Sequence, residues 1–72
     1  MAQENLEKYF MEAEPGRFTE NDLNVILAHC AQFDISDITM QTGEPIIMEE
    51  YGKLRKITRK ILTNAETGDL LN

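Results

Sequence analysis

The sequence predicts a small α+β domain in which an antiparallel sheet of about three strands is flanked by helices. Three observations carry this prediction. Residues 36–57 alternate apolar and polar side chains around two glycine turns, as half-buried strands do. Residues 20–33, just before them, have the apolar spacing of an amphipathic helix. The tetrad Thr63-Asn64-Ala65-Glu66, just after them, is a capping box and predicts the start of a second helix.

The first 17 residues are expected to form a flexible arm ahead of the domain. Four side chains in the arm have the i, i+3, i+4, i+7 spacing of a helix face: Leu6, Tyr9, Phe10 and Ala13. A helix of this length is marginal in water, and Pro15-Gly16 would end it. The alternative to a frayed arm is one that docks on a neighbouring subunit.

The helix expected at residues 20–33 has recognisable start signals. Thr19 is the candidate N-cap with Asp22 three residues later, and Phe18 and Leu23 have the spacing of a hydrophobic staple. One face of this helix carries the side chains that we assign to the core: Leu23, Ile26, Leu27, Cys30, Ala31 and Phe33.

The first strand is expected at residues 37–41, where the apolar period changes to two and places Ile38 and Met40 on one face. Residues 42–45 have the composition of a turn, and the second strand begins at Ile46.

Tyr51-Gly52 is the expected two-residue loop of a hairpin between the second and third strands. Such a loop fixes the cross-strand pairs as Glu50 with Lys53 and Met48 with Arg55. Leu54 and Ile57 would then fall on opposite faces of a regular strand, so we consider a β-bulge in the third strand that would bring them together.

The second helix should start at the capping box, contain Gly68, and supply Leu70 and Leu71 to the core. It has a start signal and no stop signal before Asn72. We therefore expect residues 18–72 to be a domain that is incomplete at its C-terminal side, and the chain to be a fragment of a longer protein.

The 72 residues carry a net charge of −6 that is unevenly spread. Residues 1–50 hold eleven acidic and two basic residues (−9), whereas residues 51–72 hold five basic and two acidic ones (+3). A mainly acidic chain is repelled by nucleic-acid phosphates, so direct nucleic-acid binding is not expected. The single cysteine, the polar N-terminus and the lack of an apolar run of about 18 residues favour a cytoplasmic protein that does not insert into a membrane.

Few side chains could carry chemistry. His29 and Cys30 are adjacent on a helix, so their side chains diverge by about 100°, and a single His and a single Cys fall short of the ligands that zinc needs. We interpret Cys30 as a core residue and His29 as a solvated one. Glu49 and Glu50 point to opposite faces of a strand and are poorly placed for acid–base catalysis. No metal or catalytic site is expected, and Asp34 and Asp37 at the helix-to-strand corner are read as structural.

No Gly-x-x-x-x-Gly-Lys-Ser/Thr motif is present, so the chain alone is not expected to hydrolyse ATP. The basic residues of the second half form a run: Lys53, Arg55, Lys56, Arg59 and Lys60. In one interpretation this run is a solvated strand edge that discourages edge-to-edge pairing. In the other, Arg55 or Arg59 offers its guanidinium to a phosphate or an acidic surface.

The ordered series Ser-Asp-Ile-x-x-x-x-Gly-x-Pro-Ile and x-Gly-x-Leu-Arg-x-Ile within residues 36–57 resembles the N-terminal domain of secretion and pilus-retraction ATPases. Thr39, Gln41 and the acidic turn before Gly52 most resemble the DotB-like ATPases of Dot/Icm type IVB secretion systems, with TraJ-like conjugation ATPases as close kin. The resemblance covers about residues 18–71.

This resemblance implies a PAS-like domain beside a RecA-like ATPase domain in a homo-hexamer, recruited to secretion machinery at the cytoplasmic face of the bacterial inner membrane. ATP and Mg²⁺ would bind in the ATPase domain, which lies outside these residues. Arg55 matches the family's Gly-x-x-Arg arginine, and Arg59 is the second candidate to face a neighbouring subunit's nucleotide. Glu49 and Thr39 replace an arginine and a histidine that are common in the family.

The function implied is an oligomerisation and force-transmitting domain of a type IV secretion ATPase that powers export of effectors or DNA–protein complexes. The alternative is a free-standing adaptor that binds a protein partner through its basic strand edge.

Overall fold

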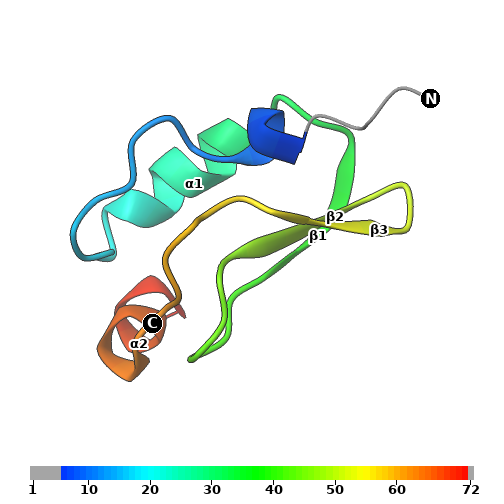
Figure 1. The fold of residues 1–72 in the computed structure, drawn as a ribbon. Coiled ribbons are helices and arrows are strands. Elements are labelled where there is room, and N and C mark those ends of the chain that lie inside the picture. The colour runs from blue at the N-terminus through cyan, green and yellow to red at the C-terminus, as the bar shows by residue number, and fades with distance from the viewer. Residues whose placement is uncertain (1–5, 72) are drawn as a thin grey trace.

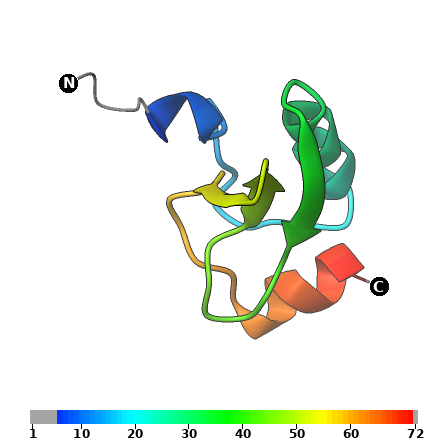
Figure 2. The same ribbon diagram turned by 90° about the vertical axis from the view of Figure 1, so that its right-hand side faces the viewer.

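The computed structural model describes residues 6–71. Its elements follow in the order η1 (Leu6–Tyr9), α1 (Asp22–Cys30), β1 (Ile35–Thr39), β2 (Ile47–Glu50), β3 (Lys53–Lys56) and α2 (Asn64–Leu71), as Figure 1 shows. The three strands form one antiparallel sheet in the order β1-β2-β3. Figure 2 shows α2 apart from α1, beside the turn that joins β1 to β2. The predicted α+β class, with a three-stranded antiparallel sheet flanked by helices, is confirmed.

The hairpin between β2 and β3 has the predicted loop and register, with Glu50 opposite Lys53 and Met48 opposite Arg55. Tyr51 and Gly52 both have positive φ values, of 51° and 80°, which is the geometry of a type I′ turn. A positive φ is uncommon for a residue with a side chain. The Tyr51 hydroxyl donates a hydrogen bond to the Asp34 carboxylate, which ties this turn to the start of β1.

The bulge considered for the third strand is wrong, because the pairing of β2 with β3 is regular. Leu54 points to solvent, with 69% of its surface exposed, while Ile57 is fully buried. The core-facing position between them belongs to Arg55, so no bulge is needed. The irregularity in the sheet lies instead in β1, between Ile35 and Asp37.

Helix α1 is shorter than the predicted 20–33. The helix begins at Asp22 with Asn21 at its N-cap, so the prediction of Thr19 as the N-cap is wrong. The Thr19 N–H still donates a hydrogen bond to the Asp22 carboxylate at 2.7 Å, in the turn that precedes the helix. Ile26 and Cys30 are buried, but Leu27 is 45% exposed and Ala31 is also exposed. Each step along a helix turns the side chain by about 100°, and α1 contacts the core along the narrow stripe of Leu23, Ile26 and Cys30, of which Leu23 is partly buried.

The described part of the expected arm, residues 6–17, packs on the domain. Tyr9 and Met11 belong to the core, and the Met11 N–H donates to the Ile57 carbonyl at 3.0 Å. The expected helix is a single 3₁₀ turn, η1, and Leu6 on its predicted apolar side is 51% exposed. Residues 1–5 of the predicted arm lie outside the described residues.

The core joins the N-terminal segment (residues 6–17), α1, the sheet and α2. Its fully buried apolar side chains include Phe18, Ile26, Ile46, Met48, Ile57 and Leu62. Leu70 on α2 is buried as predicted, whereas Leu71 is 62% exposed because it lies one residue further around a helix with a single inward face. The turn before β2 pairs with residue 62, since Gly43 N–H donates to the Leu62 carbonyl at 2.8 Å.

Candidate functional site

The two arginines predicted to meet a phosphate lie in different environments. Arg55 is 9% exposed and points from β3 toward the N-terminal segment. Its Nε lies 3.5 Å from Glu50 Oε1, and its guanidinium carbon lies 4.8 Å from the centre of the Tyr9 ring. The Tyr9 hydroxyl donates to the same Glu50 oxygen at 2.7 Å. Arg55 is thus part of a buried polar cluster that joins the hairpin to η1.

This cluster (Tyr9, Glu50 and Arg55) stabilises the fold through groups that depend on one another. The side chains of Glu50 and Arg55 are only 12% and 9% exposed, so removal of either would leave the other charge poorly solvated. The hydrogen bond to Glu50, together with burial, raises the pKa of Tyr9. Tyr9 therefore remains a protonated donor, and its ring covers the Arg55 guanidinium by a cation–π contact.

Arg59 lies at the surface, with 59% of its side chain exposed. Its guanidinium carbon is 4.2 Å from the centre of the Phe10 ring, and its Nη1 is 4.0 Å from Glu14 Oε2. The Glu14 carboxylate also accepts backbone N–H groups from Arg59 at 2.8 Å and from Lys60 at 3.1 Å. These groups form an anion site that a carboxylate of the same chain occupies.

Glu66 is the most buried charge of the described residues, at 1% exposed. The predicted capping box is confirmed, because Thr63 N–H donates to Glu66 Oε1 at 3.0 Å and Glu66 N–H donates to Thr63 Oγ1 at 3.2 Å. The other carboxylate oxygen accepts the Phe18 N–H at 2.7 Å and pairs with the Lys60 ammonium. Sequence reasoning found the cap but neither of these partners, of which Phe18 is 48 residues away and Lys60 is six residues away.

The electrostatics of Glu66 follow from these contacts. Burial alone would raise the pKa of this carboxyl, but the hydrogen bonds from Lys60, Phe18 and Thr63 outweigh burial and lower the pKa to about 2. Lys60 also donates to the Gly16 carbonyl at 3.0 Å. One buried carboxylate and one lysine therefore fasten the N-terminal segment to α2.

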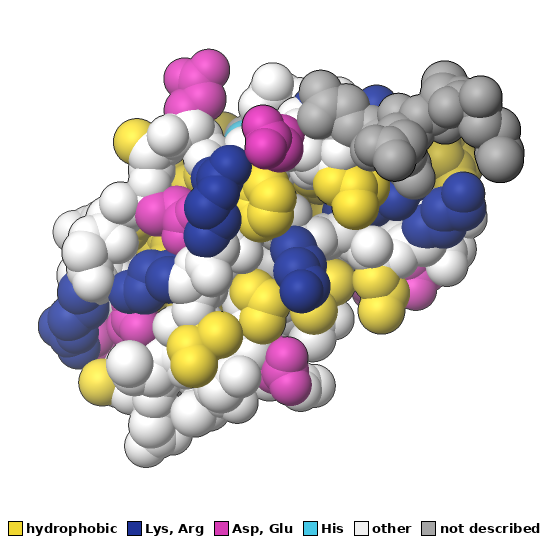
Figure 3. Space-filling model, viewed as in Figure 1, with side chains coloured by type: hydrophobic (Ala, Val, Ile, Leu, Met, Phe, Trp, Pro, Cys, Tyr) yellow, Lys and Arg dark blue, Asp and Glu magenta, His cyan; other side chains and the backbone are white. Residues whose placement is uncertain are grey.

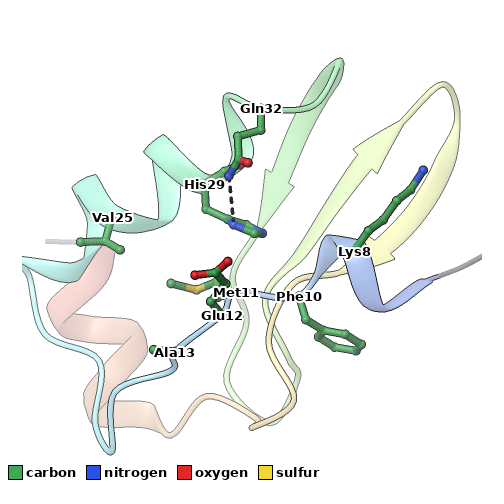
Figure 4. A pocket seen from close by; sticks show the side chains of 8 residues that line it. All are labelled: Lys8, Phe10, Met11, Glu12, Ala13, Val25, His29 and Gln32. Atoms are coloured by element: carbon green, nitrogen blue, oxygen red, sulfur yellow. Dashed lines mark hydrogen bonds between the residues drawn. The ribbon is translucent and has the colours of Figure 1, made fainter.

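A groove of about 510 Å³ lies between the N-terminal segment and α1, and Figure 4 shows the side chains of Lys8, Phe10, Glu12, Val25, His29 and Gln32 around it. His29 was expected to be solvated, but it is half-buried and its Nε2 lies 2.7 Å from the Tyr9 carbonyl oxygen. A carbonyl can only accept, so Nε2 carries the proton. His29 is therefore a structural donor that holds the N-terminal segment on α1, a role that needed the long-range contact to recognise.

A second groove of about 340 Å³ lies at the junction of η1 and β3 and is lined by Leu6, Tyr9, Phe10, Leu54 and Lys56. We call this the η1–β3 groove. It lies on the predicted basic strand edge, and two of its apolar side chains, Leu6 and Leu54, are more than half exposed. On the face of the molecule drawn in Figure 3, basic side chains are interspersed with apolar and acidic ones.

The remaining candidates from the sequence have structural contacts. Cys30 is a core residue as predicted, and burial raises the pKa of its thiol. Glu49 accepts a hydrogen bond from Ser36, whereas Glu50 faces Tyr9, so the two carboxylates diverge as expected. Among residues 6–71, no group of three or more His, Cys, Asp or Glu side chains is placed to hold a metal ion. None of the helices described is both long and apolar enough to span a bilayer.

No protein-family model and no curated protein matches the chain. A solved structure does match it: the X-ray structure of the ATPase DotB from Legionella pneumophila has a TM-score of 0.82 and 51% sequence identity to the chain. This chain is similar to part of DotB. The predicted resemblance to DotB-like ATPases is thereby confirmed.

The match with DotB covers 88% of this chain and 17% of the DotB chain. The chain therefore spans about one sixth of the length of DotB and corresponds to a small domain of a larger protein. The comparison leaves the contacts of Arg55 and Arg59 untested, so their nucleotide-facing roles stay predictions.

Proposed function

We propose that this chain is the N-terminal domain of a hexameric DotB-like type IV secretion ATPase, in which it forms a subunit interface and transmits force during export of effectors or DNA–protein complexes. The observation that carries the proposal is the 51% identity to the ATPase DotB over 88% of the chain. ATP and Mg²⁺ would bind in the ATPase domain of the parent protein. The assembly would work at the cytoplasmic face of the inner membrane, against the secretion machinery there.

The η1–β3 groove supports an interface role. Leu54 and Leu6 expose 69% and 51% of their surfaces, and both line this groove together with Lys56. Exposed apolar side chains that lie together are a surface that a second protein can bury. A neighbouring subunit's ATPase domain is the partner that this proposal assigns to the groove.

The two arginines would contribute in different ways. Arg59 has an exposed guanidinium, so it can reach a neighbouring subunit's nucleotide without unfolding any part of the domain. Arg55 would have to leave Glu50 and Tyr9 to do the same. We therefore assign direct phosphate contact to Arg59 first, and propose that Arg55 reaches a phosphate only if the buried cluster opens.

A chimera tests the proposed function. In it, this chain replaces the matching segment of DotB, and oligomer mass and ATP turnover are measured against DotB itself. We expect a hexamer that hydrolyses ATP. The variant Arg59→Gln in the chimera should lower turnover at saturating ATP without changing oligomer mass. Lys53→Gln is the matched control, because Lys53 is an exposed base at the start of β3, six residues before Arg59. A folded chimera that stays monomeric would refute the interface role, and equal turnover of Arg59→Gln and Lys53→Gln would refute the role of Arg59.

The alternative function is a free-standing adaptor that binds a protein partner through its basic strand edge, and the η1–β3 groove is the observation that favours it. The parent reading frame separates the two. A continuation that encodes a Gly-x-x-x-x-Gly-Lys-Ser/Thr motif supports the ATPase, whereas a continuation without one leaves the adaptor.

A further inference from the structure

The contact between Glu14 and the segment that follows β3 has the chemistry of an occupied anion site. Two consecutive backbone N–H groups, from Arg59 and Lys60, donate to the two oxygens of one carboxylate, at 2.8 and 3.1 Å. The Arg59 guanidinium stands 4.0 Å away on the same oxygen that its own N–H contacts. Adjacent N–H groups combined with a guanidinium form a donor set that also binds phosphate oxygens.

The surroundings fit a site that can open. The Glu14 side chain is 15% exposed and the Arg59 side chain is 59% exposed, so the guanidinium forms the outer wall and solvent lies beyond it. The Phe10 ring, 4.2 Å from the Arg59 guanidinium carbon, keeps that guanidinium near the two N–H groups. Lys60 points the other way, toward Gly16 and Glu66, and contributes only its backbone N–H.

We propose that Arg59 and the N–H groups of Arg59 and Lys60 form a phosphate-binding site, and that Glu14 blocks it by occupying it. Phosphate and Glu14 exclude one another because both accept from the same donors. The inference rests on the proposed function in one respect, since that function identifies the phosphate as part of a neighbouring subunit's nucleotide.

Exchange of one anion for the other requires little rearrangement of the backbone. Met11 is held by the Ile57 carbonyl, and the Gly16 carbonyl is held by Lys60, so the chain is anchored on both sides of Glu14. Rotation of the Glu14 side chain alone would empty the site. Glu14 would thus compete with phosphate for these donors, so that only a phosphate held close by another group, as in an assembled oligomer, displaces it.

The test is a titration of the ¹⁵N-labelled chain with pyrophosphate, followed by NMR at the backbone amides. We compare the wild type with Glu14→Gln and with Glu12→Gln, a matched control that removes the same charge from an exposed position two residues away. Glu14→Gln should bind pyrophosphate about tenfold more tightly than the wild type, because the competing charged acceptor is gone. The shifts should centre on the amides of Arg59 and Lys60. Glu12→Gln should behave as the wild type does.

Equal affinities of Glu14→Gln and Glu12→Gln, or shifts that avoid Arg59 and Lys60, would overturn the proposal. If Glu14→Gln loses its dispersed spectrum, Glu14→Asp replaces it, since it keeps the charge and withdraws the carboxylate by one methylene; it too must bind more tightly than the wild type. Adding Arg59→Gln to Glu14→Gln should abolish binding, and retained binding would exclude the guanidinium from the site.

A parallel titration with ATP distinguishes the source of the phosphate. ATP should bind about as tightly as pyrophosphate, because the site has donors only for phosphate oxygens, and ATP shifts that bypass Arg59 and Lys60 would contradict the assignment. These measurements use this chain alone. An inactive DotB chimera would therefore refute the proposed function without affecting the anion site. Equal pyrophosphate affinities of Glu14→Gln and Glu12→Gln would refute the anion site without affecting the proposed function.

Discussion

Replacing Glu66 with glutamine removes one buried negative charge and keeps nearly the same side-chain shape. A glutamine has one carbonyl oxygen, so it can accept either the Phe18 N–H or the Thr63 N–H, and its amide group must face the other donor. The Lys60 ammonium also loses its counter-charge. We therefore expect Glu66→Gln to destabilise the domain.

The magnitude follows from the pKa of Glu66, which folding lowers from its ordinary value of 4.5 to about 2. Each pKa unit corresponds to 1.36 kcal/mol, so the ionised carboxylate contributes about 3 kcal/mol to the free energy of unfolding at neutral pH. Because the folded-state pKa is the lower one, the unfolded chain takes up the proton first as the pH falls. The contribution is complete above about pH 5 and is lost as the pH falls through about 2.

Urea denaturation followed by circular dichroism measures this contribution directly. At pH 7 the free energy of unfolding of Glu66→Gln should lie about 3 kcal/mol below that of the wild type, and the gap should shrink as the pH is lowered toward 2. Asp69→Asn is the control on the same helix, because Asp69 pairs with Arg17 at the surface and such pairs contribute about 0–1 kcal/mol. A gap that is independent of pH, or no larger than that of Asp69→Asn, would refute the reasoning.

Two further predictions concern the hairpin. Gly52→Val should lower the free energy of unfolding by about 1–2 kcal/mol, since Gly52 has a φ of 80° that disfavours a β-branched side chain; an unchanged melting temperature would contradict this. Arg55→Ala should cost about 3–5 kcal/mol, because it leaves the buried Glu50 carboxylate without its cation. Urea denaturation of Arg55→Ala beside Lys53→Ala checks it, and equal effects of the two variants would argue against a buried ion pair.

The features predicted from the sequence are those decided by neighbouring residues. The Thr63–Glu66 cap depends on side chains three positions apart, and the Tyr51-Gly52 loop fixes the register of the hairpin through its own two backbone conformations. Both signals can be read without knowing what else packs nearby. The α+β class followed from them and from the change of apolar period.

The contacts of the N-terminal segment that the sequence did not reveal join residues at least 20 positions apart, such as His29 and Tyr9. Tyr9 and Glu50 are 41 residues apart, and Glu14 and Arg59 are 45 apart. The residue spacing of the N-terminal segment predicts an apolar side. It does not predict that the Tyr9 hydroxyl, the Tyr9 carbonyl and the Glu14 carboxylate each form a hydrogen bond with the folded domain. Because the segment has only a marginal tendency to form a helix, its sequence predicts an arm without fixed contacts.

The placement of Arg55 links these long-range contacts to the proposed function. The register puts Arg55 on the core side of β3, opposite Met48, where an apolar residue would ordinarily lie. The Glu50 carboxylate and the Tyr9 ring help to make burial of its charge tolerable, and Tyr9 is in place because His29 and Met11 hold the segment around it. Release of that segment would therefore weaken the burial of Arg55 as well as the Glu14 contact with Arg59. Under the proposed function, a force on residues 9–16 would act on both arginines at once.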